Sequence, residues 1–421
     1  MHTHLNHPAV ALVLRLAAAA LSFGFGIAAA RLLGIDGFGL VSVMLGIINV
    51  GVVFALLGHE TLATREVAAL RRGADPRATW AYSRSAARQV WLAGILVLFV
   101  LVFVVSLLPL GKRVGAEFIA LLLLVPLMAR TRLSQGIIRG AHQASLSLVP
   151  DGIVRPGLAV LMLGGLILAG VQAELGFVLA MNGCALVALV LGKRWERGAL
   201  ARVTASEAGD TPSEPCHFSM PIFASSILAV LVSQLALIAT GLLATPTEAG
   251  LYAAAERFSL AAALVGQAVY LAVASRFAAL HVTGDIGALR DLIRKVTRSV
   301  TLATLLVCGV LAIASEPLLG LYGTGFANAA SVMHVLLLSV LFNAGAGPTG
   351  QVLLMTRNEG DHMAAMAWSL AVQLALIMLL VPSHGVMGAA WAVLVSTLVW
   401  NGLMMYYVRR RLALNPVLAF A

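Results

Sequence analysis

Apolar runs of about twenty residues recur along the whole chain, separated by short polar turns. Runs of that length span a bilayer when they are wound as α-helices. They are continuous rather than alternating, which disfavours a membrane β-barrel. The pattern predicts an all-α polytopic membrane protein with twelve transmembrane helices, at about 9–33, 38–58, 89–109, 117–136, 149–170, 174–192, 218–242, 250–278, 298–316, 330–353, 363–381 and 386–407.

The longest stretch without an apolar run lies near the middle of the chain, at residues 193–217. It is charged at its start and rich in Pro, Ser, Thr and Gly towards its end, which is typical of a solvated linker. We therefore expect a six-helix bundle at 1–192, a cytoplasmic linker at 193–217, a second six-helix bundle at 218–408 and a cytoplasmic tail at 409–421. The first apolar run is too long for the core of a signal peptide and lacks a basic start, so we expect it to be retained.

The two halves resemble each other in one local pattern. Each contains a Leu-Leu pair at the end of its first span, a tight polar turn and then Gly-Leu at the start of the next span, and the matching glycines are Gly39 and Gly250. Six spans per half would give both repeats the same orientation in the membrane. Transporters built in this way bind their substrates between the halves.

Composition and charge support the membrane prediction. Charged residues make up 11% of the chain, against roughly 25% in soluble domains. The net charge of +10 does not require a nucleic-acid partner, because 22 of the 28 Lys and Arg residues lie in or beside the loops after even-numbered spans, counting the C-terminal tail. Cytoplasmic loops collect such residues, so we expect both termini in the cytoplasm.

No pattern in the chain indicates catalysis. There is no Gly-rich nucleotide loop ending in Gly-Lys-Ser/Thr, and no His, Cys or carboxylate cluster has metal-ligand spacing. The three cysteines are scattered, so no disulfide framework is implied. We expect no enzyme activity, no cofactor and no metal. The basic segment 284–298, with apolar residues at helical spacing, suits a helix that lies at an anionic membrane surface.

Polar residues inside predicted spans are the candidates for function, because charges at bilayer depth are costly. Arg15 stands about six residues into the first span, where it either lines a cavity for an anionic group or extends to the interface. The span at 250–278 carries a polar stripe. Within it, Glu256 and Gln267, with Arg257 beside them, favour a water-filled passage over simple helix packing.

Three further features concern helix ends and bends. Asp151 and Arg155 are four residues apart, which favours a structural ion pair. Glu60 and Arg65 are a candidate gate, with an ordinary solvated helix end as the alternative. The Gly and Pro residues at 345–350 predict a bend in the tenth span.

Several segments together resemble a known family. They are Arg31-Leu-Leu-Gly-Ile-Asp-Gly-Phe-Gly39, Gly58-His-Glu-Thr, Ala249-Gly-Leu-Tyr-Ala-Ala-Ala-Glu-Arg257, Gly284-Asp-Ile-Gly-Ala-Leu-Arg290, the stretch from Glu316 to Ala329, and Gly347-Pro348. In this order they resemble the polysaccharide (O-antigen-type) flippases, which belong to the superfamily of multidrug, oligosaccharidyl-lipid and polysaccharide exporters. The chain lacks the basic cluster early in the first span that marks the lipid II branch of that superfamily.

The resemblance implies two six-helix bundles around a central V-shaped cavity that opens alternately to the two sides of the membrane. The substrate would be an undecaprenyl-pyrophosphate-linked oligosaccharide, moved from the cytoplasmic to the periplasmic leaflet of the bacterial inner membrane for O-antigen, lipopolysaccharide, capsule or exopolysaccharide synthesis. Arg15 and Arg257 would meet the pyrophosphate, and Arg31 would lie at the periplasmic rim. Expected partners are membrane lipids and the polymerase and chain-length proteins of the pathway, and the protein would be a monomer.

Two other functions remain open. An ion-coupled small-molecule or multidrug exporter of the same superfamily would need an acidic cavity, whereas the residues inside the spans lean basic. A polymerase-type enzyme or assembly partner of the same pathway would carry a large periplasmic loop. The longest predicted stretch on that side, after the ninth span, has only about a dozen residues.

Overall fold

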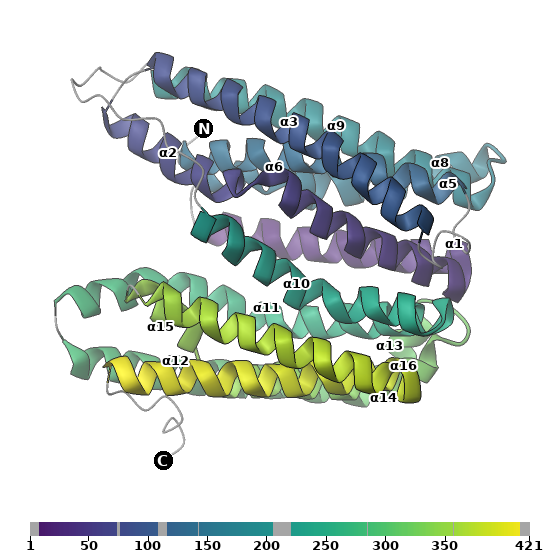
Figure 1. Ribbon diagram of the computed structural model, residues 1–421. Helices are drawn as coiled ribbons and strands as arrows, with labels where there is room; N and C mark the ends of the chain where they lie inside the picture. Colours follow the sequence, from purple (N-terminus) through teal and green to yellow (C-terminus); the bar gives the residue numbers. More distant parts are fainter. Residues whose placement is uncertain are drawn as a thin grey trace. The chain divides into compact units, whose positions relative to one another are not determined.

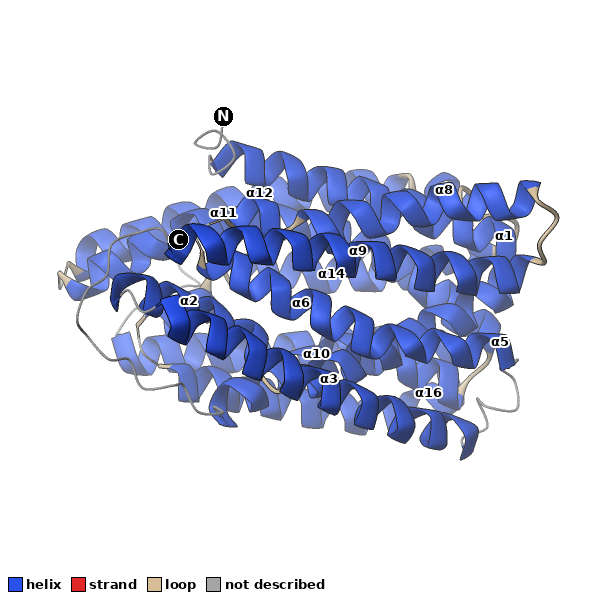
Figure 2. Ribbon diagram, turned by 90° about the horizontal axis from the view of Figure 1, so that it is seen from above, coloured by secondary structure: helices blue, strands red, loops and turns tan. Residues whose placement is uncertain are grey.

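A computed structural model describes residues 8–73, 76–107, 116–141, 143–204, 220–283, 285–356 and 358–412. Every regular element in these ranges is a helix (Figures 1 and 2), which confirms the all-α fold class. The elements are α1 Pro8–Leu56, α2 His59–Gly73, α3 Pro76–Leu107, α5 Ala116–Ile119, η2 Ala120–Leu123, α6 Leu124–Gly140, α7 Ala144–Ser147, η3 Pro150–Val154, α8 Arg155–Leu168, α9 Ala173–Thr204, α10 Met220–Leu243, α11 Pro246–Val282, α12 Ile286–Ile313, α13 Ser315–Gly320, η4 Phe326–Ala329, α14 Ala330–Gly345, α15 Thr349–Met355 and α16 Glu359–Leu412.

Glycines break the two longest helices at the places where the sequence predicts turns between spans. Gly34 in α1 has φ of +69°, and Gly385 in α16 has φ of +53°. Both values lie in the left-handed region, which glycine adopts without a steric penalty. Each of these helices therefore contains two predicted spans. The predicted bend in the tenth span is also confirmed, because α14 ends at Gly345 and Gly347 has φ of +74° before α15 begins.

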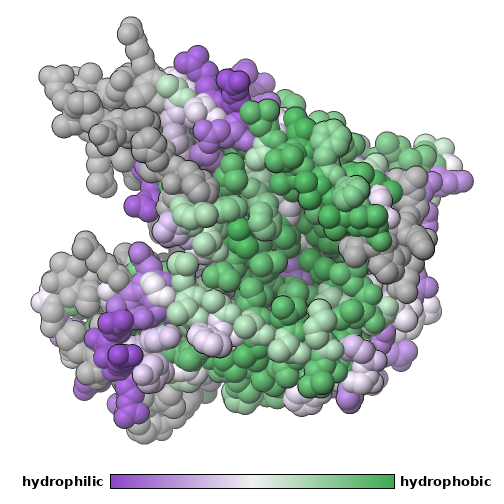
Figure 3. Space-filling view, in the orientation of Figure 1, coloured by the Kyte–Doolittle hydropathy of each residue, from purple (hydrophilic) through white to green (hydrophobic). Residues whose placement is uncertain are grey.

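Eight helices in the described ranges are long and apolar enough to cross a membrane, and α1 and α16 are two of them. The remaining predicted spans, 117–136 and 250–278, correspond to α5–α6 and to the more polar α11. In the space-filling view, apolar side chains cover the middle of the helices and hydrophilic ones gather at helix ends (Figure 3). This distribution is the one expected of helices that lie in a bilayer.

Two predictions about polar segments need correction. The basic segment 284–298 is not a separate surface helix, because residues from Ile286 onward form the first part of the continuous helix α12. Asp285 caps its start by accepting a hydrogen bond from the Ala288 N–H. Residues 193–204, predicted to be linker, are the end of α9. Lys, Arg, Glu, Ala and Leu there favour helix even outside an apolar environment. Residues 205–217 of the predicted linker lie outside the described ranges.

The chain divides into two compact units. Unit 1 comprises Met1–Leu33 and Met44–Val230, and unit 2 comprises Gly34–Val43 and Leu231–Ala421. In unit 1, α6 is central and packs against α2, α3 and α9, while α8 packs on α9. In unit 2, α11, α12, α14 and α16 pack together. The bundle boundaries expected from the sequence stay a prediction.

In unit 2, the two matching glycines of the sequence repeat lie in one close helix crossing. A Cβ atom on Gly39 would lie 2.0 Å from the Pro246 carbonyl oxygen, and one on Gly250 would lie 2.3 Å from the Ile35 carbonyl oxygen. Each carbonyl belongs to the residue four positions before the opposite glycine, so the contact is symmetrical between the repeats. Only glycine permits backbones to approach this closely.

Candidate functional site

Unit 1 contains a buried network around Glu196 of α9. Arg130 Nη2 lies 2.8 Å from Glu196 Oε2, and the two side chains are 7% and 4% exposed. Ser134 donates to the same carboxylate oxygen at 2.7 Å, and Ser83 of α3 donates to Oε1 at 2.7 Å. Arg130 Nη1 also donates to Ser134 Oγ at 2.6 Å. Both carboxylate oxygens are satisfied, as a buried ion pair requires.

A second ion pair lies at the end of the same helix. Arg139 pairs with Glu60 of α2, and both side chains are about one-third exposed. Glu60 therefore bonds to α6, whereas Arg65 is exposed on α2. The residue beside Glu60, His59, donates from Nε2 to Gln89 Oε1 at 2.8 Å. Burial lowers the pKa of the His59 imidazole, and the hydrogen bond with Gln89 opposes that shift.

The third arginine of α6 has no carboxylate partner among the residues that the structure describes. Arg132 is half-buried, and its Nη2 donates to Asn49 Oδ1 of α1 at 2.9 Å. No carboxylate in the described ranges lies within ion-pair distance of it. Arg132 precedes the end of α6 by eight residues, which corresponds to about 12 Å along the helix. In the described part of the chain, no carboxylate therefore compensates the charge of Arg132, which lies four residues before the end of the predicted span at 117–136.

The predicted pair in the fifth span is present. Arg155 Nη1 lies 3.0 Å from Asp151 Oδ1, and the two side chains are about one-fifth exposed. Asp151 belongs to the π-helical turn η3, which precedes α8. Arg15 lies in α1, but its side chain is outside the described set, and Arg31 is exposed on α1.

The three candidates on α11 differ in their surroundings within unit 2. The Arg257 guanidinium lies over the ring of Phe38, 5.4 Å from the ring centroid. Phe38 in turn packs edge-on against Tyr322 and Phe326. Arg257 is thus part of the aromatic cluster that holds segment 34–43 to this unit. Glu256 is half-buried beside it, and Gln267 is exposed farther along α11.

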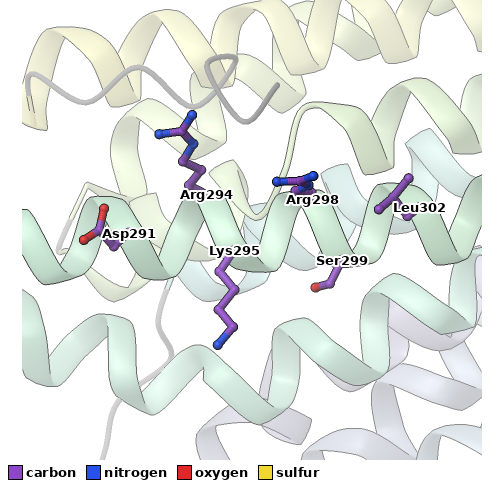
Figure 4. Close-up of a pocket in the computed structure, with 6 residues that line it drawn as sticks. All are labelled: Asp291, Arg294, Lys295, Arg298, Ser299 and Leu302. Carbon is purple, nitrogen blue, oxygen red and sulfur yellow. The ribbon is translucent and has the colours of Figure 1, made fainter. Parts of the chain in front are cut away.

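A basic pocket of about 400 Å³ lies along α12. Figure 4 shows its six lining side chains, with Lys295 extending to one side of the helix and Arg294 to the other. The lining residues are Asp291, Arg294, Lys295, Arg298, Ser299 and Leu302. Farther along the same helix, Leu302, Leu305 and Leu306 are each at least half exposed. Cationic groups therefore adjoin an apolar surface, an arrangement that suits an amphipathic anion.

The described residues hold no cluster of three or more His, Cys, Asp or Glu side chains that could bind a metal ion. The structure pairs Arg130 with Glu196 and Arg132 with Asn49, and sequence reasoning counted both arginines only as loop charges. One signal could have identified the arginines, since both fall inside the predicted span at 117–136. Glu196 carried no such signal, because it lay in the predicted linker.

Among known families, the chain matches "Polysaccharide biosynthesis protein" over residues 8–277. None of the curated proteins matches the chain by sequence. Among solved structures, similar folds include an inward-facing MATE-family multidrug resistance transporter of the MOP superfamily, with a TM-score of 0.74 at 13% identity over 97% of this chain and 98% of that one.

Two further structures share the fold. One is the lipid II flippase MurJ in an inward closed conformation, with a TM-score of 0.64 at 14% identity over 94% of this chain and 87% of that one. The other is a MOP-superfamily transporter from Pyrococcus furiosus, with a TM-score of 0.66 at 13% identity over 98% of both chains. These likenesses confirm the predicted twelve-helix fold of this superfamily, although the central V-shaped cavity itself stays a prediction.

Proposed function

The chain belongs to the polysaccharide biosynthesis protein family, and from this membership we propose that it is a flippase for undecaprenyl-pyrophosphate-linked oligosaccharide. It moves this substrate from the cytoplasmic to the periplasmic leaflet of the bacterial inner membrane, with both of its own termini in the cytoplasm. The translocated oligosaccharide is then used to synthesise a surface polysaccharide such as O-antigen, capsule or exopolysaccharide. The fold, shared with a lipid II flippase, is compatible with a lipid-linked substrate.

The observation that carries the proposal is the uncompensated charge of Arg132. Its neighbours Arg130 and Arg139 are neutralised by Glu196 and Glu60, whereas Arg132 bonds to a neutral amide. An arginine at membrane depth is costly unless an anion joins it. A guanidinium fork matches phosphate oxygens, so a diphosphate is a suitable anion. The basic pocket on α12, with exposed leucines beyond it, supports a substrate with an anionic head and a lipid tail.

Transport proceeds by rocking of the two halves around the substrate, as in other transporters with repeats of this kind. In this mechanism Arg15 and Arg257 attract the diphosphate, Glu256 and Gln267 meet sugars or a coupling ion, and Arg31 lies at the periplasmic rim. Glu60 and Arg65 take part in a cytoplasmic gate, which Arg139 joins through its ion pair with Glu60. The pair of Asp151 and Arg155 is structural.

The second candidate function is that of an ion-coupled multidrug exporter. It is compatible with the same fold, because a MATE-family multidrug resistance transporter shares that fold. The fold therefore does not discriminate between the two functions, and the charges favour the first. An exporter of amphipathic cations needs acidic groups in its binding site, whereas Arg132 bonds to a neutral amide and, among the described residues, has no carboxylate within ion-pair distance. Drug susceptibility of cells with and without the gene tests the alternative directly, and we expect no difference.

The proposal is tested with purified protein in liposomes that contain a polyprenyl-diphosphate-linked oligosaccharide, with leaflet exchange as the readout. We expect Arg132→Ala to slow exchange by about 10- to 100-fold, because charge-assisted hydrogen bonds contribute about 1.5–3 kcal/mol each. Arg132→Lys retains the positive charge but loses the forked geometry of the guanidinium. We expect its exchange rate to lie between those of the wild type and Arg132→Ala. Arg84→Ala removes an exposed arginine of α3 and serves as the matched control.

Two outcomes would contradict the proposal at different levels. Exchange by Arg132→Ala at the wild-type rate would refute the proposed role of Arg132 in binding the diphosphate. The flippase function itself would be refuted if the folded wild-type protein failed to exchange any lipid-linked oligosaccharide. Arg257→Ala is paired with Phe38→Leu, because the latter removes the ring beneath the guanidinium and leaves the charge. A contact between Arg257 and the substrate is indicated only if Arg257→Ala loses exchange and Phe38→Leu retains it.

A further inference from the structure

Unit 2 contains a second pocket, whose lining is neutral. Its polar lining residues come from α14 and from both arms of α16, on either side of the Gly385 break. Those that matter for the argument are Ser339, Asn343, Ser369, Gln373, Ser396 and Trp400. They fall near the middle of the predicted spans 330–353, 363–381 and 386–407, so the pocket lies near the bilayer midplane. None of its described lining residues is charged.

Gln373 indicates what kind of ligand the pocket would bind. Its side chain is 1% exposed, and its Oε1 atom is buried without a hydrogen-bond donor in the described part of the chain. A buried amide oxygen without a donor costs about 1–3 kcal/mol. In a lipid environment, few other groups are available to satisfy it. An occupant that donates a hydrogen bond removes that cost.

The serines of the pocket also present acceptors rather than donors. Ser369 Oγ donates to the Ser396 carbonyl oxygen at 3.0 Å, which links the two arms of α16. Ser339 Oγ donates to the Leu336 carbonyl oxygen at 2.6 Å, and Ser396 Oγ donates to that of Val393 at 2.9 Å. With their protons engaged, these hydroxyls offer lone pairs to the pocket. The lining therefore suits a ligand with several O–H donors.

The chemistry of the lining residues indicates which class of ligand the pocket would bind. An anion is bound most firmly by cationic groups, and the lining residues that the structure describes include none. A metal cation would be held without a carboxylate in a low-dielectric site, where an uncompensated charge is costly. A neutral polyhydroxyl compound brings the donors without the charge, and the ring of Trp400 supplies an apolar face for its C–H groups. The amide of Gln373 can both accept from a sugar hydroxyl and donate to it.

The size of the pocket limits the occupant. Its volume is about 260 Å³, which equals the share of roughly nine water molecules in the liquid. Pockets for drug-sized ligands begin at about 300 Å³. The pocket therefore suits one sugar ring and excludes a whole oligosaccharide.

We propose that this pocket in unit 2 binds one neutral sugar unit through Gln373, the serine hydroxyls and Trp400. The inference rests on the proposed flippase function, which it extends by a subsite for the glycan that is separate from the residues for the diphosphate. The two parts of the substrate are bound by different chemical groups. Arginine binds the anionic head, and neutral oxygen atoms bind a sugar. The pocket thereby selects among lipid-linked glycans, whereas Arg132 does not.

The test compares two substrates in the liposome assay, a polyprenyl diphosphate that carries one neutral hexosamine and the same lipid diphosphate without sugar. Gln373→Leu keeps the size of the side chain and removes its hydrogen bonds. We expect it to raise the KM for the sugar-bearing lipid by about two- to tenfold, with kcat little changed, because one hydrogen bond is lost. Exchange of the sugar-free lipid should not change. Gln351→Leu in α15, which lies outside the pocket, is the matched control.

Binding is also measured directly by saturation-transfer NMR on the detergent-solubilised full-length protein with methyl hexosides. We expect signals from the wild type that Gln373→Leu and Trp400→Leu weaken and that Gln351→Leu retains. An unchanged KM in Gln373→Leu, while the wild type exchanges both lipids, overturns the sugar subsite and leaves the flippase function intact. Thermal stabilisation by Na⁺ that depends on Gln373, without any by hexosides, overturns it in favour of a cation site. Absence of exchange by the wild type refutes the flippase function itself.

Discussion

At the scale of single residues, the charges of α6 decide where an anion can bind. Arg130, Arg132 and Arg139 lie on one helix, and their partners come from α9, α1 and α2. Neutralisation of the first and third leaves Arg132 as the arginine of α6 that is available to a ligand. The sequence shows all three arginines but not their partners, because a side chain's partner depends on which helices pack together.

The buried ion pair is the residue-scale feature most sensitive to substitution. Glu196→Ala removes both the charge opposite Arg130 and the acceptor for Ser83 and Ser134. We expect a loss of about 3–5 kcal/mol of stability, because it leaves an uncompensated buried charge. The measurement is thermal unfolding in detergent.

Two variants make this expectation falsifiable. Glu117→Ala removes an exposed carboxylate and should change stability by less than about 0.5 kcal/mol. Arg130→Met combined with Glu196→Met should recover much of the loss, because it removes both charges together. A double variant as unstable as Glu196→Ala would contradict the electrostatic explanation.

At the scale of elements, glycine sets both the breaks and the closest packing. Gly34 and Gly385 interrupt α1 and α16 with positive φ, which is the reason each long helix contains two spans. The sequence predicted these turns because the local pattern of apolar and polar residues shows them. It also matched Gly39 with Gly250 as a repeat, but their contact became known only from the structure.

The glycine crossing predicts opposite effects for two glycine substitutions in the same helix. In Gly39→Ala the added Cβ would lie 2.0 Å from the Pro246 carbonyl oxygen, so the backbone must move. We expect a loss of about 1–3 kcal/mol, the usual cost of overpacking. Gly24→Ala meets no atom within 4 Å and should be neutral or stabilising by up to about 1 kcal/mol, because alanine favours helix. Thermal unfolding of both variants checks the prediction, and equal destabilisation would contradict it.

At the scale of the whole molecule, the distribution of basic residues predicts the orientation in the membrane. Most Lys and Arg residues lie at one set of loop positions, together with the C-terminal tail. The family, the fold and the long apolar helices support a multi-pass membrane protein. The orientation itself follows only from the charge rule and stays a prediction.

Cysteine labelling tests this orientation. In a variant without the three native cysteines, Lys112→Cys lies in a predicted periplasmic loop and Asp210→Cys in the predicted cytoplasmic linker. We expect a membrane-impermeant maleimide to label position 112 in cells with an intact inner membrane, and position 210 only after that membrane is disrupted. The opposite result would reverse the orientation and place the termini outside the cytoplasm.

The sequence by itself determined the helical class, the number of spans, most of their boundaries and the family. These depend on the length of apolar runs and on local turn residues, which are properties of contiguous segments. It misjudged the polar ends of helices, as at residues 193–204, because a charged segment can be a linker or a helix according to what it packs against.

Only the tertiary structure decided the chemistry of the candidate sites. Glu196 meets Arg130 from 66 residues away, Phe38 lies beneath Arg257, and Ser369 bonds to the carbonyl of Ser396 across a glycine break. Such contacts depend on side chains that distant helices bring together, and no local pattern records them. Among the residues that the structure describes, the same packing leaves Arg132 without a carboxylate and Gln373 Oε1 without a donor. Those two residues carry the proposals because their interactions are incomplete within the described ranges.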